Sequence, residues 1–223
     1  MQRRVSTNPV DKIAGMMFPL RTEYSPIYDE RQSEEDAWIA FTNVMDRHLL
    51  SHLFFDFPEP GNGSKCWRPS WKQVMTETLP SHHLNLWPIG VIKLMEGTES
   101  ELYCGPCIES GYVQGLADVL SDGSIRQGEL VAKDDIGATH TFKIVAEHQY
   151  PVPDASYTLI GSGGYDYIPE ELEPYVMKYW VLGTTRQNGK FQKFSVFRML
   201  DDEEKMRLRE LGVAKSDIQM FLC

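Results

Sequence analysis

The sequence lacks the apolar run of about 18 residues or more that a membrane-spanning helix needs. It is also short of positive charge, because 22 Lys and Arg residues stand against 32 Asp and Glu residues, which gives a formal net charge of −10. Binding to DNA or to an anionic membrane needs a basic surface, so neither partner is expected. The basic stretch Met1–Pro9 has no apolar segment behind it and does not predict a signal peptide. We therefore expect a cytoplasmic protein.

Cysteine is scarce as well, and four cysteines in 223 residues do not make a disulfide scaffold. The sequence contains no G-x-S-x-G elbow and no pattern that assembles a nucleophile, a base and an orienting acid. An apolar share of 42% is nevertheless enough for a proper core. Composition therefore predicts a folded protein and favours a non-catalytic one that needs no cofactor.

Hydrophobic periodicity divides the chain into four expected parts. These are an irregular and helical segment (1–60), a Trp/Pro-rich connector (61–85), a β-rich domain (86–200) and a C-terminal helical cap (201–223). The predicted fold class is α+β, with the β-rich part forming an antiparallel β-sandwich or a small β-barrel.

Both ends of the chain carry helix signals. Ser33 is a good N-cap before an acidic first turn, and an apolar stripe then predicts one helix over Ser33–Leu53. Near the C-terminus, Asp201 and Glu204 resemble a capping box. Ser216 and Gln219 repeat that pattern, so a second helical turn is expected over Ile218–Leu222.

Between these ends the periodicity is two, which predicts strands. The sequence Asn188-Gly189 is typical of a two-residue type I′ hairpin turn. That turn would place Val181 opposite Val196 and Gly183 opposite Phe194. The expected strands are Val91–Met95, Ile108–Val119, Gln127–Ala132, His140–Glu147, Tyr157–Ile160, Met177–Thr185 and Phe191–Met199.

The tetrapeptide Cys104-Gly105-Pro106-Cys107 is the motif of thioredoxin-type oxidoreductases. In those enzymes the first cysteine lies at a helix N-terminus, which lowers the pKa of its thiol. The residues that follow, Ile108–Gly115, include two glycines and make a poor helix. We therefore interpret the motif as a tight Gly-Pro turn that leads into a strand, with thiol–disulfide chemistry as an alternative.

Zinc binding is a related alternative. Cys104 and Cys107 have the spacing of a zinc knuckle, and Cys66, His82 and His83 could complete a tetrahedral site. A second closely spaced cysteine pair is missing, and adjacent histidines in an extended segment point in opposite directions. Zinc is therefore an alternative and not the expected cofactor.

A third alternative is a β-barrel that binds a small molecule. Its cavity would be lined by the aromatic residues of the β-rich part, such as Tyr112, Tyr157, Tyr179 and Trp180.

Two N-terminal regions resemble fungal heterokaryon-incompatibility (HET) proteins, in the region downstream of the HET domain. Ser6–Met16 is similar to a basic stretch of that family that contains Asp-Lys-Ile. Ile27–Glu30, with Glu35, Ala37 and Trp38, resembles the acidic stretch and helix that follow it, and Trp67–Trp71 is similar to the family's Pro-Ser-Trp element.

The resemblance covers residues 1 to about 75, and it implies a role in fungal non-self recognition. It carries no catalytic residue onto this chain. The leading hypothesis is therefore a non-catalytic interaction or scaffold region, whose partner is another protein or an N-terminal HET domain.

Overall fold

The computed structural model describes residues 10–17, 29, 31–76, 91–95, 101–163 and 177–223. Four short helices come first: α1 (Val10–Met17), α2 (Glu34–Asn43), α3 (Arg47–Phe55) and α4 (Trp71–Thr76). Eight strands and one more helix follow: β1 (Val91–Leu94), β2 (Glu101–Gln114), β3 (Arg126–Lys133), β4 (Thr139–Ala146), β5 (Ala155–Gly161), β6 (Tyr179–Thr185), β7 (Phe191–Met199), α5 (Asp202–Glu210) and β8 (Lys215–Phe221).

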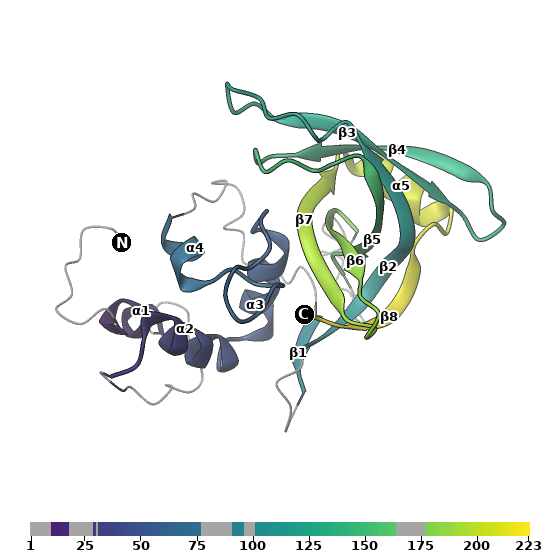
Figure 1. Ribbon diagram of the computed structural model, residues 1–223. Coiled ribbons are helices and arrows are strands. Elements are labelled where there is room, and N and C mark those ends of the chain that lie inside the picture. The colour runs from purple at the N-terminus through teal and green to yellow at the C-terminus, as the bar shows by residue number, and fades with distance from the viewer. Residues whose placement is uncertain (1–9, 18–28, 30, 77–90, 96–100, 164–176) are drawn as a thin grey trace.

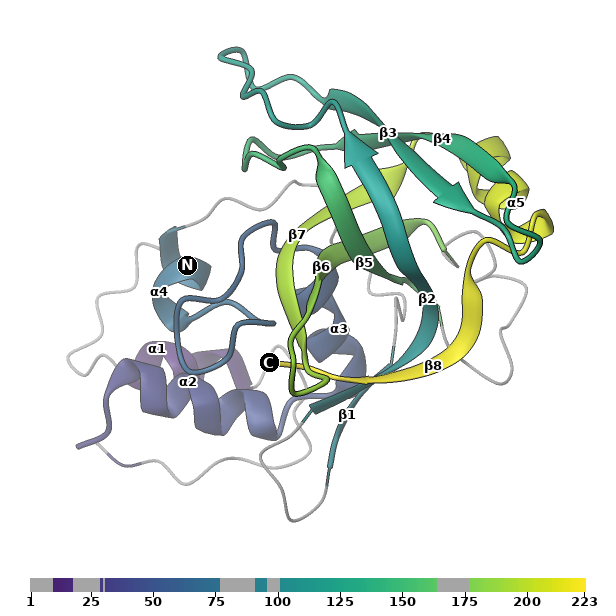
Figure 2. The same ribbon diagram turned by 45° about the vertical axis from the view of Figure 1, so that its right-hand side comes forward.

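Six of the strands close into a small antiparallel barrel (Figures 1 and 2). Neighbours pair in the order β2-β3-β4-β7-β6-β5, and pairing between β5 and β2 completes the ring. Strand β2 has 14 residues, and its N-terminal half extends beyond the ring. There β1 pairs with one edge of β2 and β8 with the other. Closure leaves the ring strands without a free edge between them.

Apolar side chains from each of the six ring strands fill the barrel interior, among them Trp180, Phe142 and Leu159. Two glycines make room for the large ones. A Cβ atom at Gly161 would lie 2.9 Å from the ring of Trp180, and one at Gly111 would lie 2.7 Å from the side chain of Leu130. The interior is therefore a close-packed core in which large residues fit over glycines.

The hairpin of β6 and β7 confirms part of the predicted register and corrects the rest. Val181 lies opposite Val196 as expected. The loop has three residues instead of two, because Arg186 N donates to Lys190 O and Gly189 takes a positive φ of 75°. The pairs next to the loop are therefore displaced by one residue, and Gly183 lies opposite Lys193 instead of Phe194. A register shift between Gly183 and Leu182 restores the expected pairing for the rest of the hairpin.

Helices α1–α4 lie on one side of the barrel (Figure 1). Their buried side chains, such as Trp38 and Phe54, form one apolar cluster with residues from the outer wall of the barrel, such as Val181 and Phe191. We call this cluster the outer seam. The helices therefore have no separate core, and the part boundaries expected at residues 60 and 85 stay a prediction.

The single helix predicted over Ser33–Leu53 is wrong, because α2 ends at Asn43 and α3 begins at Arg47. The start is as expected, with the Ser33 side chain accepting from Asp36 N. At the break, the Thr42 hydroxyl donates to Ile39 O, and such bonds compete with helix continuation. The break reorients α3 so that Leu50 and Phe54 are buried in the outer seam.

The predicted fold class is also wrong. The described chain is mostly β, its helices are few and short, and they flank the sheet without forming helical domains. Helix α5 begins at the predicted cap, where Glu204 N donates to Asp201 Oδ1. The residues expected to form a second C-terminal helix are strand β8 instead. They pair with the free half of β2, and this sheet pairing overrides the local helix signal.

Candidate functional site

The tetrapeptide Cys104–Cys107 lies inside strand β2, so the predicted tight turn is wrong. The register with β8 shifts between Gly105 and Cys107, at Pro106, which has no N–H to donate to a ladder. The Tyr103 hydroxyl occupies the space over Gly105 and donates to Gly161 O. The Gly-Pro pair therefore serves strand packing.

Cys107 is buried in this strand. Burial raises the pKa of its thiol to about 11, and the nearby Glu109 carboxylate adds to the increase. Because the thiolate is the nucleophilic form, a raised pKa disfavours attack on a disulfide. The strand continues to Gln114, so no helix follows the motif to supply a dipole.

The structure places the zinc candidates in different surroundings. Cys104 is partly exposed on β2, and Cys66 lies in the loop before α4, where its N–H donates to Cys223 O. His82 and His83 lie outside the described residues. Among the residues that are described, no group of three or more His, Cys, Asp or Glu side chains could hold a metal ion.

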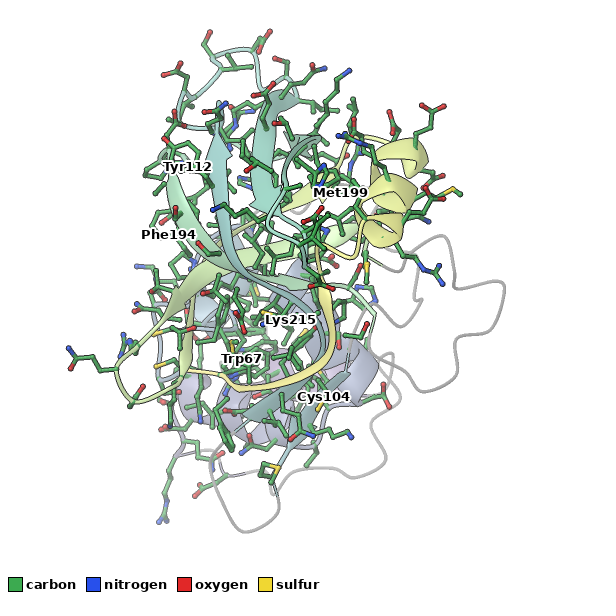
Figure 3. The ribbon with its side chains drawn as sticks, turned by 90° about the vertical axis from the view of Figure 1, so that its right-hand side faces the viewer. Trp67, Cys104, Tyr112, Phe194, Met199 and Lys215 are labelled. Carbon is green, nitrogen blue, oxygen red and sulfur yellow. The ribbon has the colours of Figure 1, made fainter. Side chains whose placement is uncertain are left out.

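The four aromatic residues proposed to line a ligand cavity are not brought together. Trp180 and Tyr157 lie in the interior cluster, whereas Tyr179 packs against the outer seam. Tyr112 is 41% exposed. Figure 3 shows it toward the opposite end of β2 from Cys104.

The loop between β2 and β3 (residues 115–125) carries the most concentrated exposed apolar surface that the structure describes. Val119, Leu120 and Ile125 are 57%, 38% and 50% exposed. Burying such side chains against a partner is favourable, at roughly 25 cal/mol per Å² of apolar surface. This loop projects beyond the barrel (Figure 1).

Hydrogen bonds join this loop to its neighbour and cross-link it internally. Leu120 N donates to Gln149 Oε1, and Gln149 Nε2 donates to Ser124 O, both from the adjoining β4–β5 loop. Within the loop, Gly123 N donates to Leu120 O and Ser124 N donates to Asp122 Oδ1. A loop that is already ordered loses little conformational entropy when it binds.

Arg126, the first residue of β3, holds the base of this loop. Its guanidinium is buried and donates to the carbonyls of Leu116 and Asp118 in the β2–β3 loop and to those of His148 and Tyr150 in the β4–β5 loop. Burial lowers the pKa of Arg126, but an arginine remains charged at neutral pH. This one side chain therefore joins the two loops at the same end of the barrel.

His148 continues this network toward the outer seam. Its Nδ1 lies 3.3 Å from Arg126 Nη2, and its Nε2 lies 2.8 Å from Val196 O. Burial lowers the pKa of His148 to about 4. The ring is therefore neutral at pH 7, with Nε2 donating to the carbonyl and Nδ1 accepting from the arginine. Both nitrogens are occupied, so His148 is poorly placed to act as a base or a metal ligand.

A small cleft lies beside His148, between the end of α3 and the outer wall of β4, β6 and β7. Its free volume of about 30 Å³ is enough for one or two water molecules. The polar side chains of the cleft have partners inside and outside it. Arg198 pairs with Glu147 at 2.6 Å, and the Asp56 carboxylate lies 2.9 Å from His52 Nδ1. The lining residues are Phe55, Asp56, Val145, Glu147, His148, Tyr179, Val196, Phe197 and Arg198.

Sequence reasoning missed the β2–β3 loop. The predicted strand Ile108–Val119 runs into this loop, whereas β2 ends at Gln114. Three large aliphatic residues on either side of a polar turn were the available signal. For Arg126 no local signal exists, because its partners come from two loops.

Comparisons with protein-family models, with curated proteins and with solved structures find no match to this chain. Within the residues that the structure describes, no helix is both long enough and apolar enough to cross a membrane.

Proposed function

We propose that this chain is a non-catalytic interaction region of a HET-like fungal protein of non-self recognition, and that the β2–β3 loop is its docking surface. The observation that carries the proposal is that one loop exposes three aliphatic side chains, Val119, Leu120 and Ile125, and is also held by hydrogen bonds to the β4–β5 loop. Rigid, exposed apolar surface is typical of protein-binding sites.

The hydrogen bonds and ion pairs of the cleft residues support a binding function more than a catalytic one. In the cleft, the charged and imidazole groups of Arg198, Glu147 and His148 are held by neighbours within the protein. A general base or nucleophile needs a group that is free to reach a substrate.

The residues that carry the resemblance to HET proteins also support the proposal. The Trp38 indole N–H donates to Pro69 O at 2.9 Å, and Trp71 N donates to the Glu35 carboxylate at 2.8 Å. The rings of Trp38 and Trp71 are 5.7 Å apart. The acidic helix and the Pro-Ser-Trp element thus form one structural unit, as a shared family feature would.

The proposed location is the cytoplasm. Its support is that four cysteines in 223 residues do not make a disulfide scaffold, which is usual for proteins of a reducing compartment.

The test compares the chain with a triple variant, Val119→Ser, Leu120→Ser and Ile125→Ser. Both are mixed with a purified HET domain, and complex formation is measured by calorimetry and by size-exclusion chromatography with light scattering. We expect the unsubstituted chain to form a complex, and the variant to bind at least about tenfold more weakly, since each buried methylene contributes about 0.8 kcal/mol.

The matched control is Ile136→Ser with Met206→Ser, which removes exposed apolar side chains elsewhere and should bind like the unsubstituted chain. A chain that stays monomeric and does not bind the HET domain would contradict the proposal, as would equal binding by the triple variant. If the chain associates only with itself, the docking surface serves a second copy and the assigned partner is wrong.

A further inference from the structure

Two of the four cysteines, Cys66 and Cys223, lie on adjoining stretches of backbone although they are far apart in the sequence. The N–H groups of Cys66 and Trp67 both donate to Cys223 O, each at 2.9 Å. Cys223 N in turn donates to Phe191 O at 3.0 Å. The first two bonds hold Cys223 against the loop that precedes α4, and the third holds it against the start of β7.

This arrangement brings the two Cα atoms within disulfide range. Standard bond lengths and the single hydrogen bond between Cys66 and Cys223 limit their Cα separation to at most about 6.8 Å. Disulfides usually span roughly 4.4–6.8 Å between Cα atoms. Both residues are partly exposed, so a small disulfide in solution can reach at least one of the thiols.

The more obvious pair in the sequence does not meet this requirement. Cys104 and Cys107 lie three residues apart on β2, which separates their Cα atoms by about 10 Å in an extended strand. Cys107 is also buried, with its pKa raised to about 11. The motif that suggests a disulfide is therefore too extended to form one.

We propose that Cys66 and Cys223 form a reversible disulfide with a glutathione-class oxidant. One thiolate attacks a sulfur of oxidised glutathione and releases one reduced glutathione, which leaves a mixed disulfide. The second thiolate then attacks the protein sulfur and releases another. Two thiols are oxidised, one glutathione disulfide is reduced, and the two protons end on the released glutathione thiols.

The bond would join the loop before α4 to the end of the β8 strand. Trp67 and Arg68, next to Cys66, are buried against the outer seam. The disulfide would therefore fasten the N-terminal helices to the barrel. It closes a loop that includes most of the chain, and long loops give the largest stabilisation in the chain-entropy account.

The test incubates the whole folded protein with oxidised glutathione, then counts free thiols after denaturation and maps disulfide-linked peptides by mass spectrometry. We expect two of the four thiols to be lost, one cross-linked peptide pair that contains Cys66 and Cys223, and a Tm that rises by roughly 10 °C. Reduction should reverse all three. Cys66→Ser and Cys223→Ser should each abolish the cross-link, whereas the control Cys104→Ser should keep it.

Four remaining thiols, glutathione adducts without a cross-link, or a cross-link to Cys104 or Cys107 would each overturn the proposal. The peptide map is made on the unsubstituted protein, so it decides between these outcomes even if a serine variant does not fold.

Discussion

The barrel interior and the outer seam are both apolar clusters, but they are stabilised in different ways. The interior is built from apolar side chains that fit over glycines, as Trp180 fits over Gly161. The outer seam gathers aromatic rings around Phe54, which lies 5.1 Å from Phe55 and 6.2 Å from Trp67 by ring centroids.

The outer seam also has buried charged groups along its border, whereas the interior cluster meets a buried charge at one end, where Arg126 donates to Leu116 O. Lys193 donates to Phe54 O at 2.6 Å, and Glu101 pairs with Lys65 at 3.1 Å. Such groups are costly to bury unless they are paired. The interior should therefore respond mainly to changes of volume, and the seam should respond also to charge and pH.

The largest effect is expected from Trp180→Ala in the interior. The substitution empties a fully buried site and removes the indole hydrogen bond to Met177 O. Large-to-small changes of this kind cost about 3–5 kcal/mol of unfolding free energy. Urea unfolding measures this loss of unfolding free energy. The control is Ile136→Ala, at a residue that is 90% exposed, and its unfolding free energy should change by less than about 0.5 kcal/mol. Equal stability of the two variants would mean that the interior is not close-packed.

A pH effect should come from the seam, through His148. Its pKa of about 4 in the folded protein lies below the ordinary value of 6.5, so the unfolded chain binds the extra proton between these values. The free energy of unfolding therefore does not depend on His148 protonation above about pH 6.5. It falls by about 2–3 kcal/mol as the pH is lowered from there to about 4.

Urea unfolding across this pH range should show a steeper decline for the unsubstituted protein than for His148→Gln, which has no proton to bind. Parallel curves would show that His148 does not link folding to pH. Trp180→Phe, a change in the interior, should leave the slope unchanged.

The smallest of the three effects is expected from Glu101→Gln, also in the seam. The change removes the carboxylate that faces Lys65 and the nearby guanidinium of Arg68. Because Lys65 is partly exposed, water screens part of the loss, and we expect a cost of about 1–2 kcal/mol. The matched control is Glu109→Gln, which breaks an exposed pair with Lys215 and should cost close to zero. A cost no larger than that of the control would contradict the importance of charge in the seam.

Local signals predicted some elements well. Strand β7 spans Phe191–Met199 as expected, and α5 begins at the cap formed by Asp201 and Glu204. In both cases the information lies within a few neighbouring residues, namely alternation over one strand and a side chain that bonds three residues ahead.

Local signals failed where a distant partner decided the conformation. Residues Lys215–Phe221 have a helix-capping pattern, yet they form β8 because the N-terminal half of β2 offers an edge. Cys104–Cys107 contains Gly and Pro, which favour a turn, yet pairing with β1 and β8 extends it. The β2–β3 loop is held by Arg126, whose bonds to two loops have no signature in the sequence of either loop.

The sequence by itself determined where most strands run and where α2 and α5 are capped. Only the tertiary structure decided that the strands close into a barrel, that the helices share a core with its outer wall, and that Cys66, not Cys104, lies beside another cysteine. The physical reason is that caps and strand periodicity arise from neighbouring residues. Ring closure, the Arg126 bonds and the contact between Cys66 and Cys223 join residues that only the folded chain brings together.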